Sequence, residues 1–195
     1  MSNYFTKRKH AIYLAYVDYM VCAVGSNAQS LIDIGSRNCG YFRWWPWIED
    51  KVSLDLSEPY RGSGVRSIKA DFFEWEPDRR YDVATCLQVL EHIQDARRFA
   101  HKLMTLADHV IVSVPYRWKE GTVRTHVQDP VDEAKFNSWF PHPPNYSIIA
   151  TEPFSRRNGQ RIVAYFDTQN PGSTAYRRTR ALASKRMLDR AAPRI

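Results

Sequence analysis

Three aspartates, Asp33, Asp55 and Asp71, each stand at or near the end of a short apolar segment. In nucleotide-binding α/β folds, an acid at the second of these places accepts hydrogen bonds from the ribose hydroxyls. A third acid can accept the amino group of an adenine, with Phe72 against the ring. The order and spacing predict that the three carboxylates line one crevice. The alternative is three ordinary turn aspartates, which are common.

Two histidines are candidates for proton transfer. His126 precedes Asp129 by three residues in a long polar segment, and the pair could be a base with its orienting carboxylate. A surface histidine beside a turn at Asp129-Pro130 explains the same residues. His92 follows Glu91 after an apolar segment and is the second candidate. We interpret His142, which lies between prolines, as a loop residue.

The elements that would position these side chains follow from the apolar pattern. Residues 4–24 are loosely helical, and residues 95–106 and 132–140 predict two further helices. Seven short segments have the composition of strands, and the early ones are continuously apolar, as in strands covered on both faces. These segments are residues 30–34, 51–55, 65–69, 81–87, 109–114, 146–151 and 161–166.

The arrangement of these segments predicts the fold class. Strands and helices alternate, and Asn158-Gly159 is a hairpin signal between the last two strands. We therefore expect an α/β protein with a doubly wound, mostly parallel sheet and an antiparallel C-terminal hairpin. We divide the chain into an N-terminal helical segment (1–28), one main domain (29–170) and a C-terminal tail (171–195).

With these features the sequence resembles the class I S-adenosylmethionine-dependent methyltransferases of the small single-domain type. The resemblance runs from about Leu31 to Asp167. It is carried by Asp33-Ile-Gly-Ser36, by Asp55, by Lys69-Ala-Asp-Phe72, and most specifically by the Val-Leu-Glu-His segment that follows strand 81–87. The resemblance implies a seven-stranded Rossmann-like sheet of order 3-2-1-4-5-7-6.

The resemblance also implies a set of site residues for the cofactor S-adenosyl-L-methionine. Asp33, Gly35 and Ser36 would line its methionine part, and Asp55 would hold the ribose. The adenine would lie against Leu56, Asp71 and Phe72, above a floor of Leu87 and Gln88. His92 would face the crevice. The usual D-x-G-x-G-x-G loop of the family is altered here, because Arg37 and Cys39 stand where two glycines belong.

Composition and charge bound the remaining possibilities. The chain has 195 residues and a net charge of +7. Residues 171–195 hold seven basic residues against Asp189, which leaves +1 for residues 1–170. Such a tail could contact phosphate, but we favour a solvated extension, because Tyr176 is its one aromatic residue that could stack on a base. The three distant cysteines favour a reduced, cytoplasmic compartment, and no apolar segment is long enough to span a membrane.

We therefore expect an enzyme that methylates an oxygen or nitrogen of a small molecule or glycan sugar, without a metal. His126 and His92 are the candidate bases. A degenerate, non-catalytic binding module is the alternative that the altered loop suggests, and an RNA or protein methyltransferase docking through the basic tail is a third. No Asn/Asp-Pro-Pro-Tyr, Pro-Cys, GxxxxGK[ST] or GxGxxG motif is present at these places, which argues against DNA-base methylation, NTP hydrolysis and NAD binding.

Overall fold

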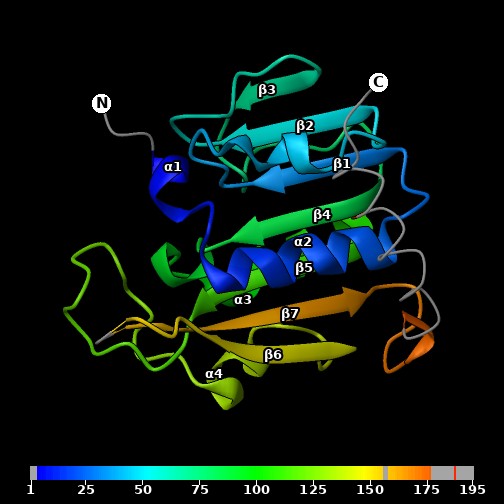
Figure 1. Ribbon diagram of the computed structural model, residues 1–195. Helices are drawn as coiled ribbons and strands as arrows, with labels where there is room; N and C mark the ends of the chain where they lie inside the picture. Colours follow the sequence, from blue (N-terminus) through cyan, green and yellow to red (C-terminus); the bar gives the residue numbers. More distant parts are fainter. Residues whose placement is uncertain (1–3, 156–157, 177–186, 188–195) are drawn as a thin grey trace.

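The computed structural model of the protein describes residues 4–155, 158–176 and 187. Its centre is a seven-stranded sheet in the order β3-β2-β1-β4-β5-β7-β6, which runs from top to bottom in Figure 1. The strands are β1 (Ser30–Ile34), β2 (Asp50–Asp55), β3 (Val65–Lys69), β4 (Tyr81–Leu87), β5 (Ala107–Pro115), β6 (Tyr146–Thr151) and β7 (Gln160–Asp167).

The first five strands are parallel, and β7 lies antiparallel between β5 and β6. This arrangement confirms the predicted fold class and strand order. Because the parallel strands share one direction, their carboxyl ends meet at the left edge of the sheet in Figure 1. The register places Asp33 beside Thr85 of β4. It also places Arg161, near the start of β7, opposite Pro115 near the end of β5.

Helices cover both faces of the sheet (Figure 1). They are α1 (Tyr4–Arg8), α2 (Ile12–Val24), α3 (Ala96–Leu106) and α4 (Glu133–Ser138), with short 3-10 turns η1 (Gly40–Trp44) and η2 (Leu90–His92). The α2 helix packs on β5, β6 and β7, and α3 packs on β4 and β5 from the other side. Buried Phe99, Leu103 and Leu106 form the apolar face of α3, as the sequence pattern predicted.

Side-chain caps start both of the later helices. The carboxylate of Asp95 accepts a hydrogen bond from the Arg98 amide at 2.9 Å and begins α3. Asp132 does the same for α4 through the Lys135 amide at 2.8 Å. Such caps satisfy amide groups that have no partner inside the helix. The α4 helix is shorter than the predicted 132–140, since it ends at Ser138.

The N-terminal helix differs from the expectation, because residues 4–24 form two helices rather than one. Ala11 is extended, with ψ 137°, and separates α1 from α2. The physical reason is that the two helices pack on different parts of the protein. Phe5 of α1 packs on Tyr41 and Trp44, with ring centroids 5.9 and 5.7 Å apart, whereas α2 lies across the sheet.

The other expectations concern membrane spans, the cysteines and the division of the chain into segments. No helix among the described residues is long and apolar enough to cross a membrane. Cys22, Cys39 and Cys86 are buried free thiols. The basic side chains of the predicted tail lie outside the described residues, so the division into 1–28, 29–170 and 171–195 stays a prediction.

Candidate active site

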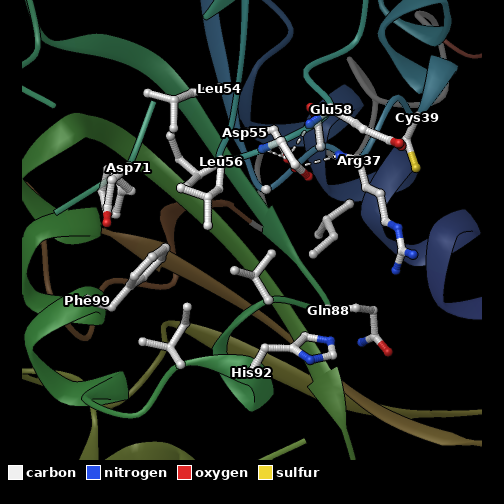
Figure 2. Close-up of a pocket in the computed structure, with 18 of the residues that line it drawn as sticks. Arg37, Cys39, Leu54, Asp55, Leu56, Glu58, Asp71, Gln88, His92 and Phe99 are labelled. Atoms are coloured by element: carbon white, nitrogen blue, oxygen red, sulfur yellow. Dashed lines mark hydrogen bonds between the residues drawn. The ribbon is translucent and has the colours of Figure 1, made fainter. Parts of the chain in front are cut away.

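A cavity of about 790 Å³ opens at the carboxyl ends of the parallel strands. Its walls come from the turns after β1, β2, β3 and β4, from the first turn of α3, and from Phe5 and Arg8 of α1. This volume lies within the range of roughly 300–1,000 Å³ that small-molecule sites occupy. Figure 2 shows Asp55 on one side of the cavity and His92 and Gln88 on the other.

The turn after β1 shapes the cavity through Gly35. Gly35 has φ +80°, and a Cβ there would lie 2.4 Å from a methyl carbon of Val89. This backbone favours glycine, and the close approach of Val89 leaves no room for a side chain. Arg37 and Asn38 continue the turn with φ 41° and 54°. The chain therefore adopts left-handed backbone in this turn although the family's second glycine is replaced.

Asp55 is held by backbone amides at the end of β2. Its Oδ1 accepts hydrogen bonds from the amides of Ser57 (2.8 Å) and Glu58 (2.9 Å), and its Oδ2 accepts one from the Arg37 amide (2.8 Å) (Figure 2). Burial raises the pKa of this carboxyl, but these hydrogen bonds outweigh burial and hold the pKa below its usual value. Asp55 is thus a fixed anion at the cavity wall, with Oδ2 carrying fewer donors than Oδ1.

Asp33 lies beneath the cavity rather than on its wall. Its side chain is fully buried and accepts hydrogen bonds from Thr85 Oγ1 (2.5 Å) and Tyr41 Oη (2.6 Å). Burial raises the pKa of Asp33 to about 7, against the lowering effect of these two bonds. Tyr41 does line the cavity. The structure therefore places Asp55 and Asp71 at the cavity but not Asp33, which hydrogen-bonds to the lining residue Tyr41.

The part of the cavity beside the ends of β2 and β3 is apolar. Leu56, which is 69% exposed, and the rings of Phe72 and Phe99, whose centroids are 4.5 Å apart, face it. Asp71 lies next to these groups, beside Phe99 in Figure 2, and accepts a hydrogen bond from the Phe73 amide at 2.8 Å. An apolar slot with one carboxylate at its edge suits a flat heterocycle that carries an amino group.

The other end of the cavity is formed by Leu87 and Gln88 at the end of β4. Gln88 has φ 59°, and its amide donates to Ser113 of β5 at 2.8 Å. Its Oε1 accepts from Arg161 Nε at 3.1 Å. The Arg161 guanidinium is 4.8 Å from the Tyr13 ring centroid and 5.2 Å from that of Trp118. Sequence reasoning missed Arg161, because its partners come from segments that are far apart in the sequence.

His92 and His126 lie together although 34 positions separate them in the sequence. Their ring centroids are 4.7 Å apart, and His126 also stacks on Trp118 at 5.7 Å. The segment that carries His126 is tied to η2, because the Val127 amide donates to the Glu91 carbonyl at 2.8 Å. His92 lines the cavity, and His126 lies directly behind it.

Both imidazoles are oriented through Nδ1. His92 Nδ1 is 3.0 Å from the Thr125 carbonyl, and His126 Nδ1 is 2.7 Å from Asp129 Oδ2. A carbonyl or carboxylate oxygen accepts, so Nδ1 carries the proton and Nε2 keeps its lone pair in the neutral ring. Burial lowers the pKa of His92, and the hydrogen bond with the Thr125 carbonyl opposes this effect only in part. The predicted pair of His126 and Asp129 is therefore in contact.

Glu91 is a functional candidate that sequence reasoning did not select. Its side chain is 1% exposed, and burial raises its pKa to about 8. Within the described part of the chain, Glu91 Oε2 and Asp129 Oδ1 are buried atoms with no hydrogen-bond partner. Buried polar atoms are nearly always paired, so these two mark an unusual site. The Leu-Glu-His segment itself was the available signal.

A family model described as "Methyltransferase domain" matches residues 13–146. The chain therefore belongs to this methyltransferase family, which confirms the resemblance seen in the sequence. No curated protein matches the chain.

Solved structures share the fold at low identity. The methyltransferase domain of a bacterial CtHen1 is 15% identical, with a TM-score of 0.60, over 84% of this chain and 99% of that one. The N-methyltransferase NodS of Bradyrhizobium japonicum, bound to S-adenosyl-L-homocysteine, is 11% identical, with a TM-score of 0.62, over 82% and 89%. The 1,6-didemethyltoxoflavin-N1-methyltransferase of Burkholderia thailandensis, bound to its substrate and S-adenosylhomocysteine, is 14% identical, with a TM-score of 0.56, over 83% and 82%. The bound cofactor products agree with the cofactor that the resemblance implies.

Proposed function

We propose that the protein transfers a methyl group from S-adenosylmethionine to an oxygen or nitrogen of a small molecule or glycan sugar. One observation carries this proposal: a single cavity has the fixed carboxylate of Asp55 on one side and, on the other, the imidazole of His92, which His126 contacts from behind. The first side suits a nucleoside, and the second suits an acceptor that must lose a proton. Family membership supports the reaction class.

The cofactor would lie along the cavity. Asp55 Oδ2, which has a single amide donor, would accept a ribose hydroxyl. Leu56 and Phe72 would cover the adenine, with Asp71 at its amino group. Gly35 and Ser36 would lie against the methionine part, and Leu87 and Gln88 would form the floor below it.

The reaction needs little from the protein beyond alignment. The acceptor lone pair forms a bond to the methyl carbon while the carbon–sulfur bond breaks, which leaves S-adenosylhomocysteine. The acceptor proton must leave, and His92, which lines the cavity, would accept it on Nε2. His126 lies behind His92, and Asp129 orients His126. A positioned base contributes typically 10²–10⁴-fold to such a step.

Small acceptors are supported by the size of the cavity and by shared folds. Among proteins of the same fold, NodS is named as an N-methyltransferase and the Burkholderia enzyme acts on didemethyltoxoflavin. The sugar option rests on analogy with His-x-x-Asp-Pro loops alone. A non-catalytic binding module, which the altered loop suggested, remains the alternative.

Isothermal titration calorimetry with S-adenosylmethionine tests the cofactor step. We expect Asp55→Asn to weaken binding at least tenfold, because hydrogen bonds to a charged group contribute about 1.5–3 kcal/mol. Asp78→Asn is the matched control, since Asp78 pairs with the exposed Arg66 and does not line the cavity. Absence of binding at millimolar cofactor in a folded sample would refute the proposal.

A further inference from the structure

Glu91, His92 and His126 form a cluster of metal-ligating type beside the cavity. One ligand atom of each lies within 4.8 Å of the other two. Glu91 and His92 belong to η2, and His126 comes from the segment between β5 and α4. No other group of three such side chains is this close among the described residues.

The orientation of both imidazoles suits metal binding. A histidine that ligates a metal almost always donates its other ring N–H to a carboxylate or backbone carbonyl, which fixes the tautomer. His126 does so toward Asp129 and His92 toward the Thr125 carbonyl. Nε2 of each ring is then the nitrogen left for a ligand.

The third side chain supplies an independent observation. Glu91 Oε2 is buried without a hydrogen-bond partner in the described part of the chain. A buried carboxyl oxygen without a hydrogen-bond partner is costly, and buried polar atoms are normally paired with another group or with an ion. A cation between Glu91 and the two imidazoles would satisfy this oxygen.

We propose that Glu91, His92 and His126 bind one divalent transition-metal cation with a coordination position open to the cavity. Two imidazoles and one carboxylate suit Zn²⁺, Mn²⁺ or Fe²⁺. Ligands about 2.0–2.2 Å from Zn²⁺ lie roughly 3.5 Å apart, so the side chains must close by about 1 Å. Side-chain rotation can supply this movement.

A cation at this place would favour a hydroxyl oxygen as the atom that is methylated. This inference rests on the proposed function. A hydroxyl oxygen that binds the open position loses its proton to water more readily, because the cation lowers its pKa. The resulting alkoxide forms the bond to the methyl carbon as the carbon–sulfur bond breaks. The two Nε2 atoms then serve as ligands rather than as bases, and the expected product is an O-methyl ether.

Metal titration of the full chain, stripped with a chelator, tests the proposal. We expect the wild type to bind one equivalent of Zn²⁺ or Mn²⁺ by calorimetry, and Co²⁺ to give the visible absorption bands of a nitrogen–oxygen site. Glu91→Gln and His126→Asn should each weaken binding at least tenfold. His101→Ala, an exposed histidine of α3, is the control and should bind as the wild type does.

Two readouts keep the outcomes separate. Circular dichroism shows whether each variant is folded. If Glu91→Gln is not folded, metal binding by His126→Asn tests the proposal instead. Calorimetry with S-adenosylmethionine is run on the same samples. Cofactor binding without any one-to-one metal binding, or metal binding unchanged in folded His126→Asn, overturns the metal site and leaves the proposed function standing. Metal binding without cofactor binding would support the metal site and overturn the proposed function.

Discussion

At the scale of single residues, two aspartates on adjacent strands have pKa values that are shifted in opposite directions. Asp55 receives several amide hydrogen bonds and has a lowered pKa. Asp33 is fully buried and receives only two hydroxyl groups, so its pKa rises to about 7. The same residue type thus gives a fixed anion at the cavity and a titrating group below it.

This difference predicts a pH-dependent contribution of Asp33 to stability. Its folded pKa of about 7 exceeds the ordinary value of 3.8, so the folded state holds a proton that the unfolded state has lost between these values. Stability should therefore fall as pH rises through this window, by up to about 1.4 kcal/mol per pH unit from this group.

Urea unfolding of wild type and Asp33→Asn across this window measures the effect. Asn keeps the shape and cannot titrate, so the stability of the wild type relative to the variant should decline from about pH 4 to about pH 7 and then level off. Other carboxylates contribute equally to both proteins. A difference that is constant with pH would show that Asp33 is not protonated near neutrality.

At the scale of elements, α1 is a wall of the cavity rather than a continuation of α2. Phe5 is 7% exposed, packs on Tyr41 and Trp44, and lines the cavity. Because α1 has five residues, tertiary contacts rather than helix propensity must hold it in place.

We expect Phe5→Ala to release α1, because this truncation removes the buried ring that packs the helix on Tyr41 and Trp44. Loss of this wall should weaken S-adenosylmethionine binding about tenfold, which corresponds to about 1.4 kcal/mol. Hydrogen exchange of the α1 amides should accelerate, while α2 stays protected. Lys7→Ala, which changes an exposed side chain of the same helix, is the control. Unchanged cofactor affinity with faster exchange would show that α1 is not part of the binding wall.

Elements were predictable from the sequence where the signal is local. The strands β1 and β4 read as continuous apolar runs because both faces are covered, and Asn158-Gly159 marks the β6–β7 hairpin. The break between α1 and α2 was not predictable, because it depends on which distant surface each helix covers. The burial of Asp33 under Tyr41 and the contact of His92 with His126 depend on tertiary structure in the same way.

At the scale of the whole molecule, the basic tail and the residues that line the cavity occupy different parts of the sequence. The residues that line the cavity end at Thr125, and the seven basic residues of the tail follow Tyr176. Tyr176 itself packs on Tyr146 and Tyr165, with ring centroids 5.7 and 5.8 Å apart.

We expect a chain that ends at Tyr176 to bind S-adenosylmethionine within about twofold of the full chain, because every lining residue is kept. Non-specific affinity for nucleic acid, if the full chain shows it at low salt, should be lost together with its salt dependence. Calorimetry and a salt titration with a short duplex measure both. A large loss of cofactor affinity would instead make the tail part of the cofactor site.

The reversed direction of β7 has a consequence for how such a protein can change its substrate. Since β7 runs against its neighbours, its first residues, with Arg161, rather than its last ones reach the reactive edge. The hairpin turn that precedes β7 therefore also opens toward this edge. Insertions in that turn could reshape the acceptor entrance while the parallel strands, and the nucleoside contacts they carry, evolve independently.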